Sequence, residues 1–220
     1  MNMKKMTLVL WLMALLTSAF AGDNDSIQRP PIKGVVKVSG TLSAIKTGRL
    51  YLFESFGRSV NKLDSTLITS GAFEFPQREL ELGIYMIGLN ENNMCPVILN
   101  PAEKEVTLRF GSAKLETSMS SENSRENQGW GRYMQQEPGL LKAIKDARVG
   151  AAKNPEQKAT FEATLAAKEK ELLDLQNTLM KEYEGTQLAK LLRWKQEPNK
   201  TDINKYWSNI DFGDVSIIRS

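Results

Sequence analysis

The sequence predicts an α+β protein, in which a small antiparallel β-sandwich is followed by a helical region with one long amphipathic helix. Up to about Thr117, apolar and polar residues alternate with a period of two, and Gly, Pro and Asn interrupt the alternation about every eight to twelve residues. Beyond Thr117, apolar residues recur every three or four positions, as they do on one face of a helix. The chain of 220 residues therefore divides into a strand-rich part and a helical part.

The strand-rich part is expected over residues 34–117. Its alternating runs are rich in β-branched and aromatic residues, which suit a pleated surface that is buried on one side. Successive strands are expected to run antiparallel, because the turns between them are short and a parallel crossover needs a dozen or more residues. The main expected strands are Val35–Val38, Arg49–Phe53, Ser65–Thr69, Ala72–Phe75, Ile84–Ile87, Cys95–Leu99 and Val106–Phe110.

The helical region is expected over residues 118–220. Ser121 and Asn123 are both candidate N-caps of its first helix, and Asn123 forms a capping-box pattern with Glu126. The Pro138-Gly139 pair is expected to interrupt this helix, because proline removes a main-chain donor and glycine weakens a helix.

The longest helix is expected to begin after Asn154, with Pro155 in its first position, and to end at Glu184, before Gly185. A helix over residues 155–184 would be about 45 Å long at a rise of 1.5 Å per residue. Because a small sandwich is narrower than this, the helix must lie across another surface or pair with its neighbour. A shorter helix follows, with an apolar face formed by Leu188, Leu191 and Leu192.

The first 21 residues have the layout of a cleaved secretory signal peptide. Lys4 and Lys5 precede an apolar run over residues 6–16, which is too short to span a bilayer core of about 30 Å, and Ala19-Phe20-Ala21 is a suitable cleavage site. A membrane anchor or an amphipathic first helix is the alternative. We expect cleavage at about Ala21, a linker over residues 22–33, and an exported protein that is soluble, has no transmembrane segment and is not a lipoprotein.

The composition excludes several classes of catalytic site. The sequence contains no His and one Cys, so it lacks a Ser–His–Asp triad, a Cys–His dyad, a Cys-x-x-Cys redox pair and an imidazole or multi-thiolate metal site. The net charge is +3, and removal of the two leader lysines lowers it to +1. Nucleic-acid binding is not expected from so small a net charge. We predict that the protein is not an enzyme and has no cofactor.

Two candidate sites stand out. Cys95 is either a small core residue, as free cysteines commonly are, or an exposed thiol that forms a mixed disulfide with a redox partner. The second candidate is an aromatic set that either packs the core or an inter-domain contact, or forms a stacking platform for a sugar or peptide. It consists of Trp130, Tyr133, Trp194, Tyr206 and Trp207.

Several short motifs of the mature chain resemble a known family. They are Gly34–Gly40, Ser70–Phe75, Gly83–Tyr85, Ile98–Pro101, Ser121–Asn123 and Tyr206–Phe212. In these motifs the chain resembles the N-terminal half of envelope thiol–disulfide oxidoreductases of Bacteroidetes-type bacteria, which have a thioredoxin fold of the AhpC/TSA-like family. In that family, a domain of unknown function and a helical segment precede the thioredoxin domain. That domain, with its Cys-x-x-Cys motif, is not in this sequence, so the resemblance transfers no catalytic residue.

Three functional hypotheses remain open. The first is a non-catalytic exported envelope protein that binds or positions a protein partner, for which the resemblance suggests a thioredoxin-fold protein. The second is the shortened front part of a thiol–disulfide oxidoreductase, suggested by the apolar residues Val215, Ile217 and Ile218 near the last residue. The third is a sandwich that binds a glycan or another small ligand through its aromatic set. We expect the first.

Overall fold

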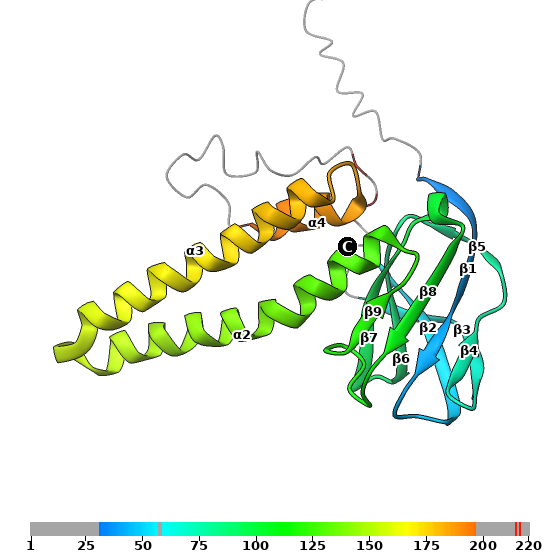
Figure 1. Cartoon of the computed structure of the whole chain (residues 1–220), viewed down its shortest axis with the longest axis horizontal. Coiled ribbons are helices and arrows are strands. Elements are labelled where there is room, and N and C mark those ends of the chain that lie inside the picture. Colours follow the sequence, from blue (N-terminus) through cyan, green and yellow to red (C-terminus); the bar gives the residue numbers. More distant parts are fainter. Residues whose placement is uncertain (1–30, 57–58, 197–213, 215, 217–220) are drawn as a thin grey trace, which may run out of the picture.

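The structure is a computed structural model that describes residues 31–56, 59–196, 214 and 216. Within these residues a strand-rich part is followed by helices, and two of the helices form a long hairpin that projects from the strands (Figure 1). The strands are β1 (Lys33–Leu42), β2 (Thr47–Phe56), β3 (Ser59–Thr69), β4 (Ala72–Glu74), β5 (Arg78–Glu81), β6 (Gly83–Asn90), β7 (Asn93–Leu99), β8 (Glu105–Phe110) and β9 (Met119–Ser121). The helices are α2 (Arg125–Lys153), α3 (Lys158–Glu182) and α4 (Gln187–Lys195), with 3-10 turns η1 (Pro101–Glu103) and η2 (Pro155–Gln157).

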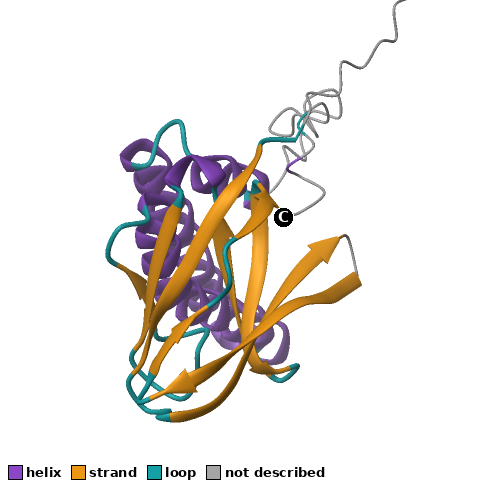
Figure 2. Ribbon diagram, turned by 90° about the vertical axis from the view of Figure 1, so that its right-hand side faces the viewer, coloured by secondary structure: helices purple, strands orange, loops and turns teal. Residues whose placement is uncertain are grey.

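The predicted α+β class is confirmed. The described strands form a nine-stranded sheet in the order β7-β6-β2-β3-β4-β1-β8-β9, with β5 paired to β1 beside this path. The sheet is strongly curved, and the helices pack on one side of it (Figure 2). It is mixed rather than wholly antiparallel, because β1 and β8 pair in parallel from Lys37–Glu105 to Leu42–Phe110. Strands this far apart in sequence escape the short-turn constraint from which the antiparallel arrangement was predicted.

The core of the sheet forms from the alternating apolar residues of its strands. In β1, Val36, Val38 and Leu42 are buried while Val35 is exposed, and in β8 Val106, Leu108 and Phe110 are buried. These strands share one hydrophobic cluster with side chains from all three helices, including Trp130 of α2, Leu179 of α3 and Leu188 of α4. The base of the helical region therefore packs directly onto the sheet.

The first helix begins later and runs further than predicted. Its N-cap is Ser124, whose hydroxyl accepts a hydrogen bond from the Asn127 N–H, so the prediction of Ser121 or Asn123 was wrong. The helix also continues through Pro138 to Lys153, so the predicted interruption was wrong as well. Residues on both sides of the proline are buried, among them Met134 and Leu140. Burial on both sides offsets the hydrogen bond that proline removes.

The other helices lie close to their predicted positions. Pro155 begins the short turn η2, and α3 itself extends over 25 residues and ends at Glu182. Gly185 follows with a φ of 79°, the left-handed conformation expected after a helix end. In α4 the predicted apolar face is buried, with Leu188, Leu191 and Leu192 all in the core. The sequence therefore located α3 and α4 to within a few residues.

Gly40 is required by the close approach of β1 to β8. A Cβ atom at this position would lie 1.9 Å from the Leu108 carbonyl oxygen, a distance that main-chain atoms do not tolerate. Gly139 is the opposite case: it is exposed in α2, and a Cβ atom there would meet no other atom within 4 Å.

We predict that Gly40→Ala lowers the free energy of unfolding by about 1–3 kcal/mol, because the two strands must separate to admit the methyl group. Gly139→Ala is the matched control and should raise it by about 0.5–1 kcal/mol, since alanine favours a helix. Urea denaturation followed by circular dichroism measures both changes. Equal effects of the two substitutions would contradict the described β1–β8 contact.

Candidate functional site

The site begins where α2 leaves the sheet, at the outer edge of β7. The side-chain amide of Asn127 accepts a hydrogen bond from the Ile98 N–H at 2.9 Å and donates one to the Ile98 carbonyl at 2.6 Å. Two residues before Ile98, the Pro96 carbonyl accepts a hydrogen bond from the Trp130 indole N–H at 3.0 Å. The first turns of α2 thus supply the bonds that another strand would make, and they fix the direction in which the helix leaves the sheet.

The residue before Asn127, Glu126, joins α2 to the start of α4. Its side chain is buried, and its carboxylate accepts hydrogen bonds from the backbone N–H groups of Gln187 and Leu188 at 2.9 and 2.8 Å. Asn100 donates a third hydrogen bond, at 2.9 Å. The first N–H groups of a helix have no partner within the helix and carry partial positive charge, so a buried carboxylate is well stabilised there.

A second carboxylate, Glu103, lies beside Glu126. It accepts hydrogen bonds from the Ser124 hydroxyl at 2.6 Å and from the Glu126 N–H at 3.1 Å. Burial raises the pKa of Glu103 above its usual value, and the charge of Glu126 adds to the shift, while these hydrogen bonds oppose it. Because the folded protein holds this proton more tightly than the unfolded chain, the stabilisation linked to Glu103 declines as the pH rises through its pKa.

Asp214 and Ser216, which follow the helices, contact α4. Lys190 forms an ion pair with Asp214 at 2.6 Å, and Gln187 donates a hydrogen bond to the Ser216 hydroxyl at 2.9 Å. Burial would by itself raise the pKa of Asp214, but the hydrogen bonds from Lys190 and Ser216 bring the pKa below its usual value. The start of α4 is therefore held by α2 on one side and by these two residues on the other.

Beyond this junction, the second half of α2, the middle of α3 and the end of α4 enclose a groove, which we call the arm groove. It has a volume of about 390 Å³. Its lining residues are Leu141, Ile144, Arg148, Glu169, Leu172, Leu173, Gln176, Lys195 and Gln196. Leu141 and Leu173 remain 47% and 44% exposed, so apolar surface is accessible to solvent here.

Charged side chains lie at both ends of the arm groove. At the far end Arg148 of α2 forms an ion pair with Glu169 of α3 at 2.6 Å. At the near end, where α4 stops, Lys195 forms an ion pair with Glu137 at 2.9 Å. An apolar surface with a charged rim of this kind is typical of a protein contact site rather than of a catalytic centre.

The structure separates the five aromatic candidates. Trp130 and Tyr133 are buried and stacked on each other with ring centroids 5.7 Å apart, so they are packing residues with no exposed ring face. Trp194 is partly buried against the core. Tyr206 and Trp207 lie outside the described residues.

Cys95 is fully buried in β7. Burial raises the pKa of its thiol far above the usual value, and the charge of Glu116 adds to the shift. Because the thiolate is the reactive form of cysteine, this position favours a packing role over mixed-disulfide chemistry.

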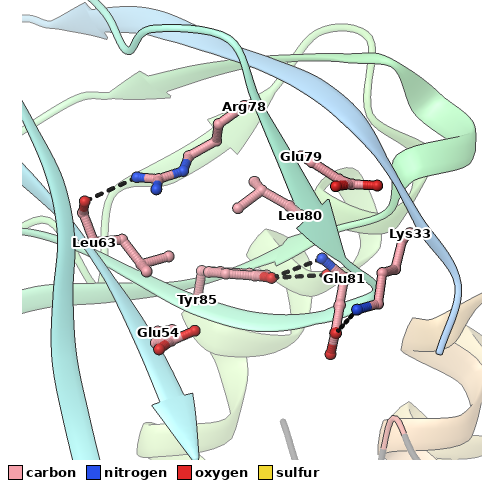
Figure 3. A pocket seen from close by; sticks show the side chains of 8 residues that line it. All are labelled: Lys33, Glu54, Leu63, Arg78, Glu79, Leu80, Glu81 and Tyr85. Atoms are coloured by element: carbon pink, nitrogen blue, oxygen red, sulfur yellow. Dashed lines mark hydrogen bonds and ion pairs between the residues drawn. The ribbon is translucent and has the colours of Figure 1, made fainter.

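A second, smaller cavity of about 160 Å³ lies between β3 and β5 (Figure 3). Arg78 extends across it from β5 and donates a hydrogen bond to the Leu63 carbonyl at 2.8 Å. Leu63 lies at a β-bulge, because the β2–β3 register passes from Asp64 to Lys62. The Tyr85 hydroxyl donates to the Glu81 carbonyl at 2.8 Å, and Lys33 pairs with the Glu81 carboxylate at 2.8 Å. The sequence did not reveal this cavity, since its charged residues come from separate strands.

In the part of the chain that the structure describes, no group of three or more His, Cys, Asp or Glu side chains is arranged to hold a metal ion. None of its helices combines the length and the apolarity needed to cross a bilayer.

Together the curved sheet, the anchored hairpin and the arm groove define an α+β module with a partly apolar groove on its arm. Residues 36–129 match a family described as a domain of unknown function (DUF4369). The matched region extends from β1 to the first turns of α2 and includes both Glu126 and Asn127. No curated protein and no solved structure matches the chain.

We predict that Glu126→Gln lowers the free energy of unfolding by about 1–3 kcal/mol, because the amide nitrogen of glutamine cannot accept the hydrogen bond from one of the two α4 N–H groups. Glu171→Gln is the matched control, since Glu171 is exposed and pairs with Lys168 of the same helix; it should change stability by less than about 0.5 kcal/mol. Thermal denaturation of both variants measures the difference. Glu126 would not be the junction residue if the two variants behaved alike.

We predict that native Cys95 reacts with 5,5′-dithiobis(2-nitrobenzoate) at least about 100-fold more slowly than the same residue in denaturant, because its thiol is buried and protonated. Consistent with this, the native protein should not accelerate the reduction of insulin disulfides by dithiothreitol. Cys95→Ala provides the background for both measurements. Fast native labelling, together with thioredoxin-like insulin reduction that Cys95→Ala abolishes, would overturn the packing role.

Proposed function

We propose that the protein is an exported, non-catalytic module of the cell envelope that binds or positions a protein partner through its helical arm. The observation that carries this proposal is the arm groove, whose apolar residues Leu141 and Leu173 are each nearly half exposed. Large apolar side chains gathered in a groove and surrounded by charges are typical of surfaces that another protein covers.

The composition supports the non-catalytic part of the proposal. The chain has no His, and its one Cys is buried with a raised pKa, so the usual imidazole and thiolate nucleophiles are lacking. Export is supported by the leader-like sequence of residues 1–21, with a soluble location in the periplasm or cell envelope after cleavage at about Ala21. A thioredoxin-fold protein is a partner that the family resemblance suggests.

Site-specific photo-crosslinking tests this function. A benzophenone amino acid at position 173, in the arm groove, should give one or a few discrete adducts when the protein is made in its native envelope and irradiated. The control position is Leu67 of β3, which is 61% exposed but lies on the sheet. Adducts at position 173 and none at position 67 support the proposal. The absence of adducts at position 173, or equal labelling at both positions, contradicts it.

A further inference from the structure

The strands β7, β6, β2 and β3 are neighbours in the sheet, and they carry apolar side chains on both of its faces. Their inward residues, such as Leu52 and Ile87, belong to the hydrophobic cluster that strands and helices share. The residues that alternate with them lie on the opposite face, because successive side chains of a strand point to opposite sides. Apolar members of that face are Tyr51 and Phe53 of β2, Leu67 of β3, Met86 of β6 and Met94 of β7. None of these five described residues belongs to the shared cluster, and we call the surface that they form the outer face.

The outer face is continuous across these strands. Tyr51 is opposite Gly88 of β6, which is opposite Met94, and a Cβ atom at Gly88 would lie 2.5 Å from the Met94 Cγ atom. The Met94 side chain therefore lies over Gly88. Further along, Phe53 is opposite Met86, and the ring centroids of Tyr51 and Phe53 are 6.0 Å apart, with both rings partly exposed. When one face of an antiparallel sheet covers the core, the other is commonly polar, so an apolar outer face needs an explanation.

The charged residues of the outer face are cations. The Lys62 Nζ atom of β3 lies 5.2 Å from the centroid of the Tyr51 ring. Arg49 of β2 donates a hydrogen bond to the Ser65 hydroxyl at 3.0 Å. Both partners are uncharged, and among the described residues neither cation forms an ion pair. Both positive charges are therefore available to a ligand.

The carboxylates of the same strands lie on the other side of the sheet. Glu54 follows Phe53 in β2 and lines the smaller cavity between β3 and β5. Asp64 is opposite the inward-facing Leu52 and pairs with Arg78 of β5 at 3.2 Å. Along the described parts of the four strands, the alternation thus places no Asp or Glu on the outer face. The outer face combines apolar and aromatic side chains with positive charge.

The shape of the outer face restricts what can cover it. The sheet curls around the core, so its outer side is convex (Figure 2). Peptides and partner helices dock in grooves or along open strand edges, and a convex sheet face supplies neither. A lipid surface adapts to a convex protein, because mobile head groups and acyl chains fill in around the side chains that enter it. Tyrosine and the long stems of lysine and arginine suit that interface, and positive charge favours anionic head groups.

We propose that the outer face binds the surface of a membrane that contains anionic lipids. Leu67 and the two aromatic rings enter the head-group region, while Arg49 and Lys62 pair with lipid phosphates. The contact is reversible, because two cations and a few apolar side chains bind far more weakly than a transmembrane helix. This inference goes beyond the proposed function, since it uses the sheet rather than the helical arm.

Flotation with lipid vesicles tests the inference. The protein is taken without residues 1–21, which lie outside the described fold and whose apolar run would itself bind lipid. It should bind vesicles made from equal parts of phosphatidylglycerol and phosphatidylethanolamine at least about 10-fold more strongly than vesicles of phosphatidylcholine, and high salt should weaken the binding. Equal binding to the two kinds of vesicle, or binding to neither, overturns the inference.

An apolar pair of variants tests the location of the contact. Leu67→Glu should lower the partition coefficient on the anionic vesicles at least about 5-fold, because Leu67 is 61% exposed on the outer face. The matched control is Val35→Glu, since Val35 is 56% exposed on β1 and lies opposite Glu79 of β5, outside the outer face. The control should change the coefficient by less than about 2-fold. Equal losses in the two variants overturn the inference.

A charged pair of variants separates the outer face from net charge. Lys62→Glu and Lys145→Glu lower the net charge by the same amount, but Lys145 is an exposed residue of α2. The first should weaken binding at least about 5-fold and the second less than about 2-fold. All the substituted side chains are exposed, so folding is not threatened, and circular dichroism checks it. Equal losses would show that net charge directs the binding, which overturns the inference.

This inference and the proposed function fail separately. Absence of protein adducts at position 173 contradicts the proposed function and leaves vesicle binding as it is, while absence of vesicle binding leaves the arm groove as a contact surface. A lipid linked to position 67 adds far less mass than a protein, so it is not mistaken for a protein adduct.

Discussion

The structure depends on a few buried hydrogen bonds where α2 leaves the sheet. The Asn127 side chain forms hydrogen bonds with the main-chain groups at the outer edge of β7. The carboxylate of the neighbouring Glu126 accepts hydrogen bonds from the first N–H groups of α4. One helical turn therefore fixes both the orientation of α2 on the strands and the position of α4 on α2. Without these bonds the strand edge and the helix start would each leave buried donors unpaired, which costs folding free energy at every unpaired group.

The same junction explains how a small sheet supports a much longer hairpin. Hydrophobic contacts at the base unite strands and helices in one cluster, while α2 and α3 alone continue outward. Along that outer part, within the residues that the structure describes, each helix packs against the other. Leu141 and Leu173 consequently stay half exposed at positions that would be buried in a bundle.

Local patterns in the sequence predicted much of this fold. The alternation in segments such as Val35–Val38 located the principal strands, and the leucine spacing located α4. Pro138 was misinterpreted, because its local cost is offset by packing on both sides of the helix, and packing is not visible in a short window. The parallel β1–β8 pair was missed for a similar reason, since it joins segments that are distant in the sequence.

The site was less predictable than the fold. Trp130 belongs to the aromatic set that the sequence singles out, but nothing local shows that its indole faces the Pro96 carbonyl or that Glu126 reaches α4. These contacts join residues more than thirty positions apart, and they exist only once the sheet has curved. The sequence did not predict the arm groove itself. It predicted only that the long helix must lie across another surface or pair with its neighbour.

The region that matches the DUF4369 family ends at residue 129, just after the anchoring turn of α2. Asn127, which bonds the edge of β7, thus lies inside the matched region, and the greater part of the hairpin lies beyond it. Seven extra residues in each helix would extend the reach of the hairpin by about 10 Å and keep its apolar stripe in register. The hairpin can therefore act as an adjustable spacer, whose length evolution can alter while the sheet stays as it is.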